Sequence, residues 1–492
     1  MKKHILIAGG GIGGMISALY LKKAGHDVTL VEKNERLGGR LAFVREKGYK
    51  VDEGPTIVLL PDMLKGILHE VGIDESSLDL LQLDPLYTIQ YQDGTFYTKY
   101  SDVLRQLEEI RRVFPKEEQG FLRFMEEMTD RFQEGQQAFL EKSFHEKRTF
   151  FTKANMKILM KLKAYRTVQS ALKKYFSDER LRDAYALQTL YVGGNPYEAS
   201  AIYSLVSYSE HAHGIYYLKG GYASLVDILE GQLIKMGVHV RKNEEVTQLV
   251  FEGKRIVQAK VNGEHIAAEA FVINGDYPAA LKQLGLDDEH DRRKYVPSSG
   301  CVMVYLGLNK MYHEAPVHQF FMGEHFDQHM KEVFQTKTIP QDPSFYTFNP
   351  SIIDPSLAPD GCSVLYMLVP VPSGDHINWE EKTNFVEKMI DRLEERGFPR
   401  LRESIVWKKV RTPNDSLREG LFEGGSFGLA PNLFQSGVFR PQVKVAETDN
   451  LYAAGASIHP GGGVPIVMQS AKLMASVLLK DLNDRKEVKL SG

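Results

Sequence analysis

The chain has 492 residues, which is enough for roughly two to four domains with substantial cores. Its formal net charge of -3 and its sequence pI of about 6.6 show no overall positive charge, so nucleic acid is excluded as an expected partner. Two cysteines, Cys301 and Cys362, are too few for a disulfide framework or a four-cysteine zinc site, which fits a reducing cytoplasm.

The N-terminal residues predict a strand over 4–8, a glycine-rich turn and a helix over about 15–21. The turn, Gly9-Gly10-Gly11-Ile12-Gly13-Gly14, satisfies G-x-G-x-x-G. In this motif Gly9 allows a tight turn, Gly11 lets the backbone approach a pyrophosphate, and Gly14 permits close helix–strand packing. The charged start and apolar stretch also look like a secretory signal, but no small-residue cleavage site precedes Lys22, and signal helices rarely carry so many glycines. We therefore expect a dinucleotide site.

A second strand, residues 28–31, ends at Glu32, close to the offset of about 20 residues expected for a carboxylate that binds a ribose. The order of elements is that of a nucleotide-binding unit: a strand, the glycines, a helix, a second strand and the acid. This order argues against a purely structural role for the glycine turn at residues 9–14. A further glycine pair follows in Gly38-Gly39-Arg40. An NAD site has no need of it, whereas in an FAD site it brings N–H groups and a guanidinium to the pyrophosphate. The sequence therefore predicts FAD.

The predicted cofactor site draws on several more segments. Gly54-Pro55-Thr56 can turn closely past the flavin, and a short strand near the C-terminus ends at Gly455 before a glycine-rich turn and a helix over about 466–482. The N-terminus of that helix would place N–H groups near the pyrimidine edge of the flavin, where reduction builds negative charge. The predicted cofactor-binding residues are Gly9, Gly10, Gly11, Ile12, Gly13, Gly14, Glu32, Lys33, Gly39, Arg40, Gly54, Pro55, Thr56, Val246, Gly455, Gly463, Val464 and Pro465.

Five segments describe the expected domain organisation. Residues 1–70, 216–290 and 440–492 are predicted to build the FAD-binding domain. Its second part has strands near 238–241, 246–250 and 256–261, and residues 270–276 read as a buried strand running into a loop. Residues 71–215 read as a helical insertion that faces substrate or membrane. Residues 291–439 contain two apolar strands, 301–308 and 362–369, which we expect in a sheet that walls a substrate cavity.

Within the helical insertion, residues 142–176 carry ten Lys or Arg and one acid, Glu146, among aromatic residues. One interpretation is a solvated basic helix. The other is a surface that meets anionic lipid, because basic residues mixed with aromatics suit an interfacial helix. The chain has no run of 18 or more apolar residues, so we expect membrane contact to be peripheral.

Together these motifs resemble the bacterial carotenoid desaturases of the phytoene desaturase family along the length of the chain. Residues 54–62, 187–193 and 425–431 are most similar to the C30 branch, the diapophytoene (dehydrosqualene) desaturases. A sister group on the same scaffold, the diapocarotenoid oxidases, converts terminal methyl groups to aldehydes. The three glycines after Pro460, where many relatives read Gly-Ala-Gly, also resemble this oxidase group.

The resemblance implies an α/β fold of the flavin amine oxidase type, with a Rossmann-like FAD-binding domain, a mixed substrate domain and an inserted helical region. It implies FAD and a long apolar polyisoprenoid substrate drawn from the membrane surface, in a cytoplasmic protein bound peripherally to the membrane. The implied reaction is desaturation of 4,4'-diapophytoene to diaponeurosporene and diapolycopene, with terminal oxidation as the alternative. Quinone and dioxygen both remain open as the electron acceptor.

Desaturation removes two non-acidic hydrogens from adjacent carbons, and flavin N5 can accept the hydride equivalent. The chemistry requires no strong acid or base, and no catalytic residue is assigned. His459 is a candidate because its loop is expected to line the flavin, and the alternative is that it only hydrogen-bonds the loop.

The same residues also bear on other function classes. A flavin oxidase of an amine or porphyrinogen shares the glycine loops, but no aromatic cage or lysine-activated flavin site is identifiable. A non-enzymatic prenyl-binding escort on the same fold would be unable to take up FAD. Gly424-Gly425-Ser426-Phe427-Gly428 matches G-x-S-x-G without the strand and helix of a nucleophile elbow. The histidines show no metal-ligand spacing, so we expect no metal.

Overall fold

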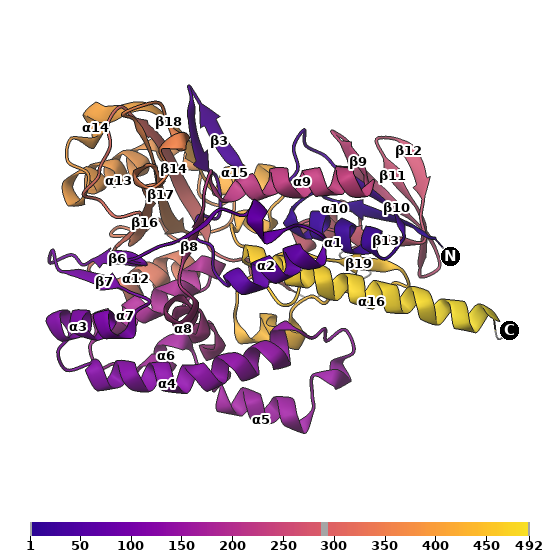
Figure 1. Ribbon diagram of the computed structural model, residues 1–492, viewed down its shortest axis with the longest axis horizontal. Helices are drawn as coiled ribbons and strands as arrows, with labels where there is room; N and C mark the ends of the chain where they lie inside the picture. The colour runs from indigo at the N-terminus through magenta and orange to yellow at the C-terminus, as the bar shows by residue number, and fades with distance from the viewer. Residues whose placement is uncertain (1, 287–293, 491–492) are drawn as a thin grey trace.

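The computed structural model describes residues 2–286 and 294–490 as an elongated α/β molecule (Figure 1). Its helices are α1 Ile12–Lys23, α2 Pro61–Glu70, α3 Val103–Val113, α4 Glu118–Gly135, α5 Lys153–Lys161, α6 Val168–Leu172, α7 Glu179–Ala186, α8 Ser204–His213, α9 Leu225–Met236, α10 Tyr277–Gln283, α12 Phe326–Lys331, α13 Thr383–Arg396, α14 Leu401–Ser404, α15 Pro413–Arg418 and α16 Val464–Leu490.

A five-stranded parallel sheet brings distant parts of the chain together, in the order β19 (Leu451–Ala453), β13 (Ala270–Ile273), β1 (His4–Ala8), β2 (Asp27–Glu32) and β9 (His239–Lys242). In the register, Ile7 lies opposite Leu30 on one side and Val272 on the other. A three-stranded antiparallel sheet of β10 (Val246–Glu252), β11 (Arg255–Val261) and β12 (Glu264–Ala267) follows β9. The predicted Rossmann-like α/β class is confirmed.

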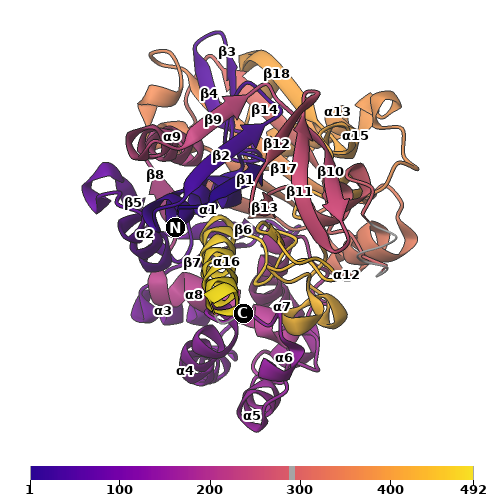
Figure 2. The ribbon, with the colours of Figure 1, turned by 90° about the vertical axis from the view of Figure 1, so that its right-hand side faces the viewer.

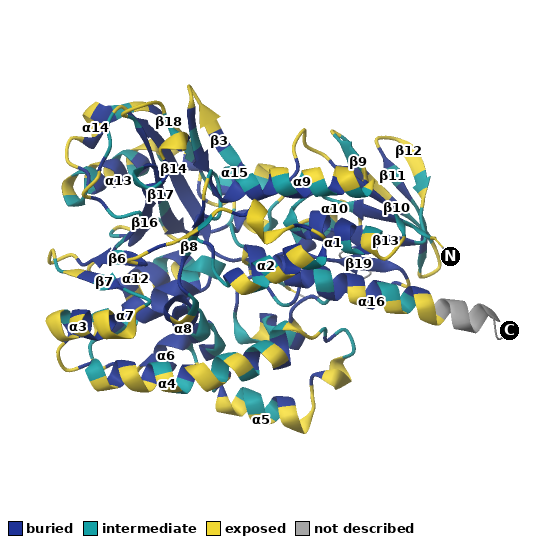
Figure 3. Ribbon diagram, in the orientation of Figure 1, coloured by how far each residue is buried: buried dark blue, intermediate teal, exposed yellow. Residues whose placement is uncertain are grey.

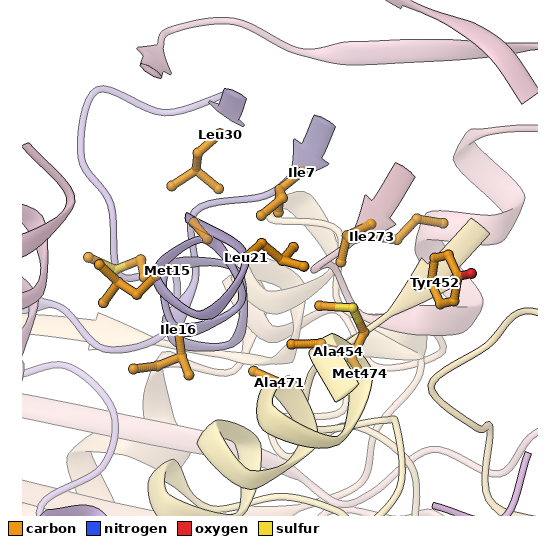
Figure 4. Close-up of a cluster of buried hydrophobic side chains, with 14 of the residues drawn as sticks. Ile7, Met15, Ile16, Leu21, Leu30, Ile273, Tyr452, Ala454, Ala471 and Met474 are labelled. Atoms are coloured by element: carbon orange, nitrogen blue, oxygen red, sulfur yellow. The ribbon is translucent and has the colours of Figure 1, made fainter. Parts of the chain in front are cut away.

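The core of this part lies between the parallel sheet and two helices. Figure 4 shows Ile7, Leu30 and Ile273 of the sheet above Met15 and Leu21 of α1, with Ile16 on the opposite side of this helix and Ala471 and Met474 of α16 below. Helix α1 is buried on most of its surface because it packs against the sheet, α9 and α16. Figure 2 shows α16 end-on beneath the sheet. The glycine loop at the start of α1 is therefore fixed on a rigid base.

A mixed seven-stranded sheet forms the second layer, in the order β18 (Ile405–Arg411), β14 (Gly300–Leu308), β17 (Ser363–Val371), β16 (Phe345–Phe348), β15 (His318–Phe321), β6 (Tyr87–Gln90) and β7 (Phe96–Lys99). The two apolar strands predicted at 301–308 and 362–369 are confirmed as β14 and β17, which pair antiparallel with Tyr305 opposite Tyr366. Two small sheets, β3 (Phe43–Glu46) with β4 (Tyr49–Asp52) and β5 (Leu80–Gln82) with β8 (Tyr216–Leu218), complete the strands.

The segment 71–215 is not helical throughout. Residues 80–99 supply β5, β6 and β7, and β6 joins the large sheet by pairing in parallel with β15. Tyr87 and Ile89 are buried at alternate positions of β6, the spacing expected of a strand. From α3 onward the segment is helical, and the Asp102 carboxylate accepts the backbone N–H of Arg105 at 2.8 Å to cap α3.

The basic stretch 142–176 is divided between α5 and α6. Between them Lys163 adopts a left-handed backbone with φ of 51°, so no continuous helix runs through the stretch. Figure 1 shows α5 at the outer edge of the helical region, and Figure 3 shows its outward face exposed. No helix within residues 2–286 and 294–490 is long and apolar enough to cross a membrane.

Candidate functional site

Two glycine loops lie in contact at the carboxyl end of the parallel sheet. The N–H of Gly38 donates to the carbonyl of Gly10 at 2.8 Å, and Gly9 has a φ of 104°. A Cβ on Gly14 would lie 2.0 Å from the carbonyl oxygen of Gly9, so this position tolerates only glycine. Gly11 is the N-cap of α1 and has no side chain, which leaves the first N–H groups of the helix available to an anion.

The carboxylate of Glu32 is held at the end of β2. Its Oε2 accepts the N–H of Gly10 at 2.7 Å, and its Oε1 accepts the backbone and side-chain N–H groups of Asn34 at 2.9 and 2.7 Å. The side chain is buried, yet it lines the cavity described next. It therefore supports the glycine loop and faces the place where a ribose would lie.

A cavity of about 1370 Å³ opens over these loops and extends from the carboxyl ends of the parallel strands to the seven-stranded sheet. All the predicted cofactor-binding residues except Gly10 and Gly14 line it, including Lys33, Val246 and the Gly54-Pro55-Thr56 turn. The third glycine loop reaches it at Gly455 and Gly463, directly before the N-terminus of α16. The structure thus gathers all three loops around one space.

Polar groups without partners surround the cofactor end of the cavity. Arg40 donates one hydrogen bond, to the carbonyl of Ser426 at 2.8 Å. Burial lowers the pKa of Arg40, and the nearby carboxylate of Asp276 offsets part of this shift. Within the described residues, the buried atoms Asn274 Oδ1, Asp276 Oδ2 and Arg440 Nε have no hydrogen-bond partner. Buried polar atoms are rarely left unpaired, so these atoms point to a polar ligand. Glycine N–H groups and Arg40 fit the pyrophosphate of FAD, and Glu32 fits its ribose.

The rest of the cavity is largely apolar. One wall is the face of the seven-stranded sheet, where alternate residues of neighbouring strands, among them Met303, Phe320 and Leu368, point inward. Helices form the opposite wall, which is lined by Phe132, Phe139, Leu140, Leu187, Leu190, Ile202, Leu205 and Val206. Strands β14 and β17 both contribute side chains to this wall, and its use by a substrate stays a prediction.

His459 does not line the cavity. Its Nε2 lies 2.9 Å from the carbonyl oxygen of Lys142, and its ring packs edge-on against Phe144. Burial lowers the pKa of His459 to about 4, so the ring is neutral at neutral pH. Its contacts are with the loop and the helical region.

Sequence reasoning passed over several cavity residues. Asn274 and Asp276 follow a buried parallel strand, and the carboxyl end of such a strand is itself a signal for a binding residue. Arg440 is buried and donates to the carbonyl of Ala456 at 2.6 Å, but no motif marks it. The described residues contain no cluster of three or more His, Cys, Asp or Glu that could hold a metal ion.

Fold and site define a flavoprotein with a nucleotide-binding sheet and a second, seven-stranded sheet beside the cavity. The chain matches the family model described as flavin containing amine oxidoreductase over residues 12–479, and it belongs to this family. A solved oxidoreductase from Methanosarcina mazei shares the fold with a TM-score of 0.64 at 18% identity, covering 96% of this chain and 99% of that one. The protein is an FAD-dependent oxidoreductase.

Two curated relatives refine the comparison. A 4,4'-diapolycopen-4-al dehydrogenase from Metabacillus indicus is 60% identical over 99% of this chain and 100% of its own length. A 4,4'-diaponeurosporene-forming 4,4'-diapophytoene desaturase from Staphylococcus haemolyticus is 31% identical over 98% of this chain and 100% of its own length. The resemblance to carotenoid desaturases and to their sister oxidases is confirmed.

Proposed function

We propose that this protein oxidises a linear C30 carotenoid at its terminal carbon, in carotenoid biosynthesis. The observation that carries this proposal is that the glycine loops and a largely apolar region line one cavity, so that a polyene can reach the cofactor while it stays in contact with apolar side chains. The choice of reaction rests on similarity: 60% identity to an aldehyde dehydrogenase of this carotenoid class, against 31% to a desaturase.

FAD, when bound, supplies a hydride acceptor. The N–H groups of Gly11 to Gly13 and the guanidinium of Arg40 would hold its pyrophosphate, and Glu32 would bind a ribose. The remaining task of the protein is to orient the substrate and exclude water. The apolar side chains of the sheet face and of the opposite helices perform it by packing along the polyene.

Desaturation of 4,4'-diapophytoene is the second candidate. It is favoured by the desaturases that match this chain over nearly its full length and by the apolar lining of the cavity, since a hydrocarbon needs no polar contact. Both reactions remove two hydrogens from the substrate and differ in where these hydrogens come from: adjacent carbons in desaturation, and the carbon and oxygen of an aldehyde hydrate in terminal oxidation.

A direct experiment separates the candidates. The FAD-loaded protein is mixed without oxygen with 4,4'-diapophytoene, with diapolycopene or with its terminal aldehyde, and flavin bleaching and products are recorded. Conversion of the aldehyde to an acid supports terminal oxidation, and new double bonds in diapophytoene alone support the second candidate. Bleaching by an amine or a porphyrinogen but by no carotenoid would overturn both. Failure to take up FAD would favour a prenyl-binding escort.

We propose further that the protein meets the membrane surface through α5 and the neighbouring segment 434–439. Phe151 is 55% exposed, Met160 62% and Phe434 77%, and the rings of Phe151 and Phe439 lie 6.5 Å apart. Lys153 and Lys157 are exposed on the same helix. Of the aromatics in the basic stretch, Phe144, Phe150 and Phe176 are buried in the core and take no part.

Quinone or dioxygen is the proposed electron acceptor.

A further inference from the structure

Three side chains form a hydrogen-bonded chain where the cofactor loop meets the substrate sheet. Thr56 Oγ1 lies 2.8 Å from the hydroxyl of Tyr346, and this hydroxyl lies 2.6 Å from Nδ1 of His318. Thr56 follows the Gly54-Pro55 turn, Tyr346 is on β16 and His318 is on β15. The three hydrogen-bonded side chains therefore link the cofactor side of the cavity to the interior of the seven-stranded sheet.

The two hydroxyl-bearing residues reach the cavity, and the histidine does not. Thr56 and Tyr346 both line it, whereas His318 is fully buried, stacked on Phe348 with ring centroids 5.0 Å apart. Burial lowers the pKa of His318 to about 3 and raises that of Tyr346, so both groups are neutral at neutral pH. The chain is thus a set of uncharged donors and acceptors ending at the cavity.

These three hydrogen-bonded side chains can offer a ligand either a hydrogen-bond acceptor or a hydrogen-bond donor. With Nδ1 of His318 accepting from Tyr346 and Tyr346 accepting from Thr56, the Thr56 oxygen offers a free lone pair. With Nδ1–H donating to Tyr346 and Tyr346 donating to Thr56, the Thr56 hydroxyl offers its hydrogen. A carbonyl oxygen needs a donor and a hydrate hydroxyl needs an acceptor, so the same chain suits both forms of an aldehyde.

We propose that the Thr56 hydroxyl, oriented by its hydrogen bond to Tyr346, binds the terminal oxygen of an oxygenated carotenoid end and so selects an aldehyde over a methyl group. On the same wall Met303, Phe320 and Leu368 are apolar and would hold the polyene. The hydroxyl of Tyr366, unpartnered within the described part of the chain, is the competing polar group. His318 acts as a positioning residue, because it touches Tyr346 and not the cavity. This inference deepens the proposed function and rests on it.

The test measures binding rather than turnover. FAD-loaded protein in detergent is titrated with a C30 polyene carrying a terminal aldehyde, or with the same polyene carrying a terminal methyl, and flavin fluorescence and the polyene absorption band are followed. Wild type is expected to bind the aldehyde more tightly. Thr56→Val and Tyr346→Phe are expected to lose about tenfold in affinity for the aldehyde and to keep their affinity for the methyl compound.

Three control variants complete the design. Thr56→Ser keeps the hydroxyl and should keep the selectivity. Tyr305→Phe should also keep it, because the Tyr305 hydroxyl donates to the carbonyl of Glu53 at 2.6 Å and Tyr305 does not line the cavity. Tyr366→Phe removes a hydroxyl on the same wall that has no partner among the described residues, and it should leave the selectivity intact. The flavin spectrum and the thermal midpoint report whether each variant is folded.

The outcomes are distinct. Loss of aldehyde selectivity in Thr56→Val and Tyr346→Phe alone supports the inference. Unchanged selectivity in these two variants, no selectivity in the wild type, or its loss in Tyr366→Phe instead, would overturn the inference while leaving the proposed function standing. Binding of neither polyene by folded, FAD-loaded wild type would overturn the proposed function itself.

Discussion

Glu32 accepts the backbone N–H of Gly10 at 2.7 Å, so the acid at the end of β2 holds the glycine loop at the end of β1. The expected ribose carboxylate is therefore also a support for the pyrophosphate loop. A ribose contact would be added to these bonds, because the carboxylate has two oxygens with several acceptor sites.

Glu32→Ala is expected to lower the affinity for FAD by about 10- to 100-fold, since it removes hydrogen bonds to a charged acceptor from both the loop and the ribose. Equilibrium dialysis of the apoprotein against FAD measures this change. The product formed at saturating FAD should stay the same, because the ribose lies far from the reacting ring. Glu46→Ala, at an exposed acid on β3, is the control. Unchanged FAD affinity in Glu32→Ala would contradict the assignment.

Gly14→Ala is expected to disrupt the first loop, because the new Cβ would lie 2.0 Å from the carbonyl oxygen of Gly9 and 3.0 Å from Asn274 Oδ1. Relief requires α1 to move away from β1, and overpacking of this kind costs about 1–3 kcal/mol or more. The thermal midpoint and the flavin content should both fall. Gly66→Ala, in α2 with nothing within 4 Å of its Cβ, should leave both unchanged or raise the midpoint slightly. Equal behaviour of the two variants would refute the steric argument.

The sequence and the structure agree where a motif is local. Each of these motifs can be recognised in a window of about twenty residues: the glycine spacing, the acid at Glu32 and the Gly455 turn. The fold brings all three to the cavity. Thr56 and Tyr346 are 290 residues apart and become neighbours only because β16 packs beside the cofactor loop. Likewise β6 joins the large sheet by pairing with β15 and brings β7 with it, a contact that no local pattern specifies.

A buried ion pair between β7 and α8 gives a further prediction. Lys99 Nζ lies 3.1 Å from Glu210 Oε2, both side chains are fully buried, and Tyr87 donates to the same carboxylate at 2.7 Å. Lys99→Met leaves the Glu210 charge uncompensated and is expected to destabilise the protein by about 3–5 kcal/mol. The double variant Lys99→Met/Glu210→Gln should recover most of this loss, because Gln still accepts from Tyr87. Thermal unfolding of the FAD-loaded proteins measures both, and a double variant no more stable than the single one would contradict the account.

The last prediction concerns how an insoluble substrate reaches this cavity. Lys153 and Lys157 are exposed on α5, beside the exposed rings of Phe151 and Phe434, whereas Lys161 is engaged with Glu134 at 2.7 Å. Each lysine near an anionic surface contributes about 1 kcal/mol, or roughly fivefold in binding. Lys153→Gln/Lys157→Gln is therefore expected to weaken binding to anionic liposomes by about 25-fold.

Sedimentation with vesicles of anionic and of neutral lipid measures the effect, which should appear on anionic vesicles and shrink as salt is raised. Phe434→Ser should weaken binding to both kinds of vesicle, because it removes apolar area rather than charge. Lys235→Gln/Lys388→Gln carries the same change of charge on α9 and α13, on the opposite side of the molecule (Figure 1), and should bind like the wild type. The flavin spectrum should be unchanged in all of these variants. If the α5 variant sediments as the wild type does, α5 is an ordinary solvated helix and the membrane surface lies elsewhere.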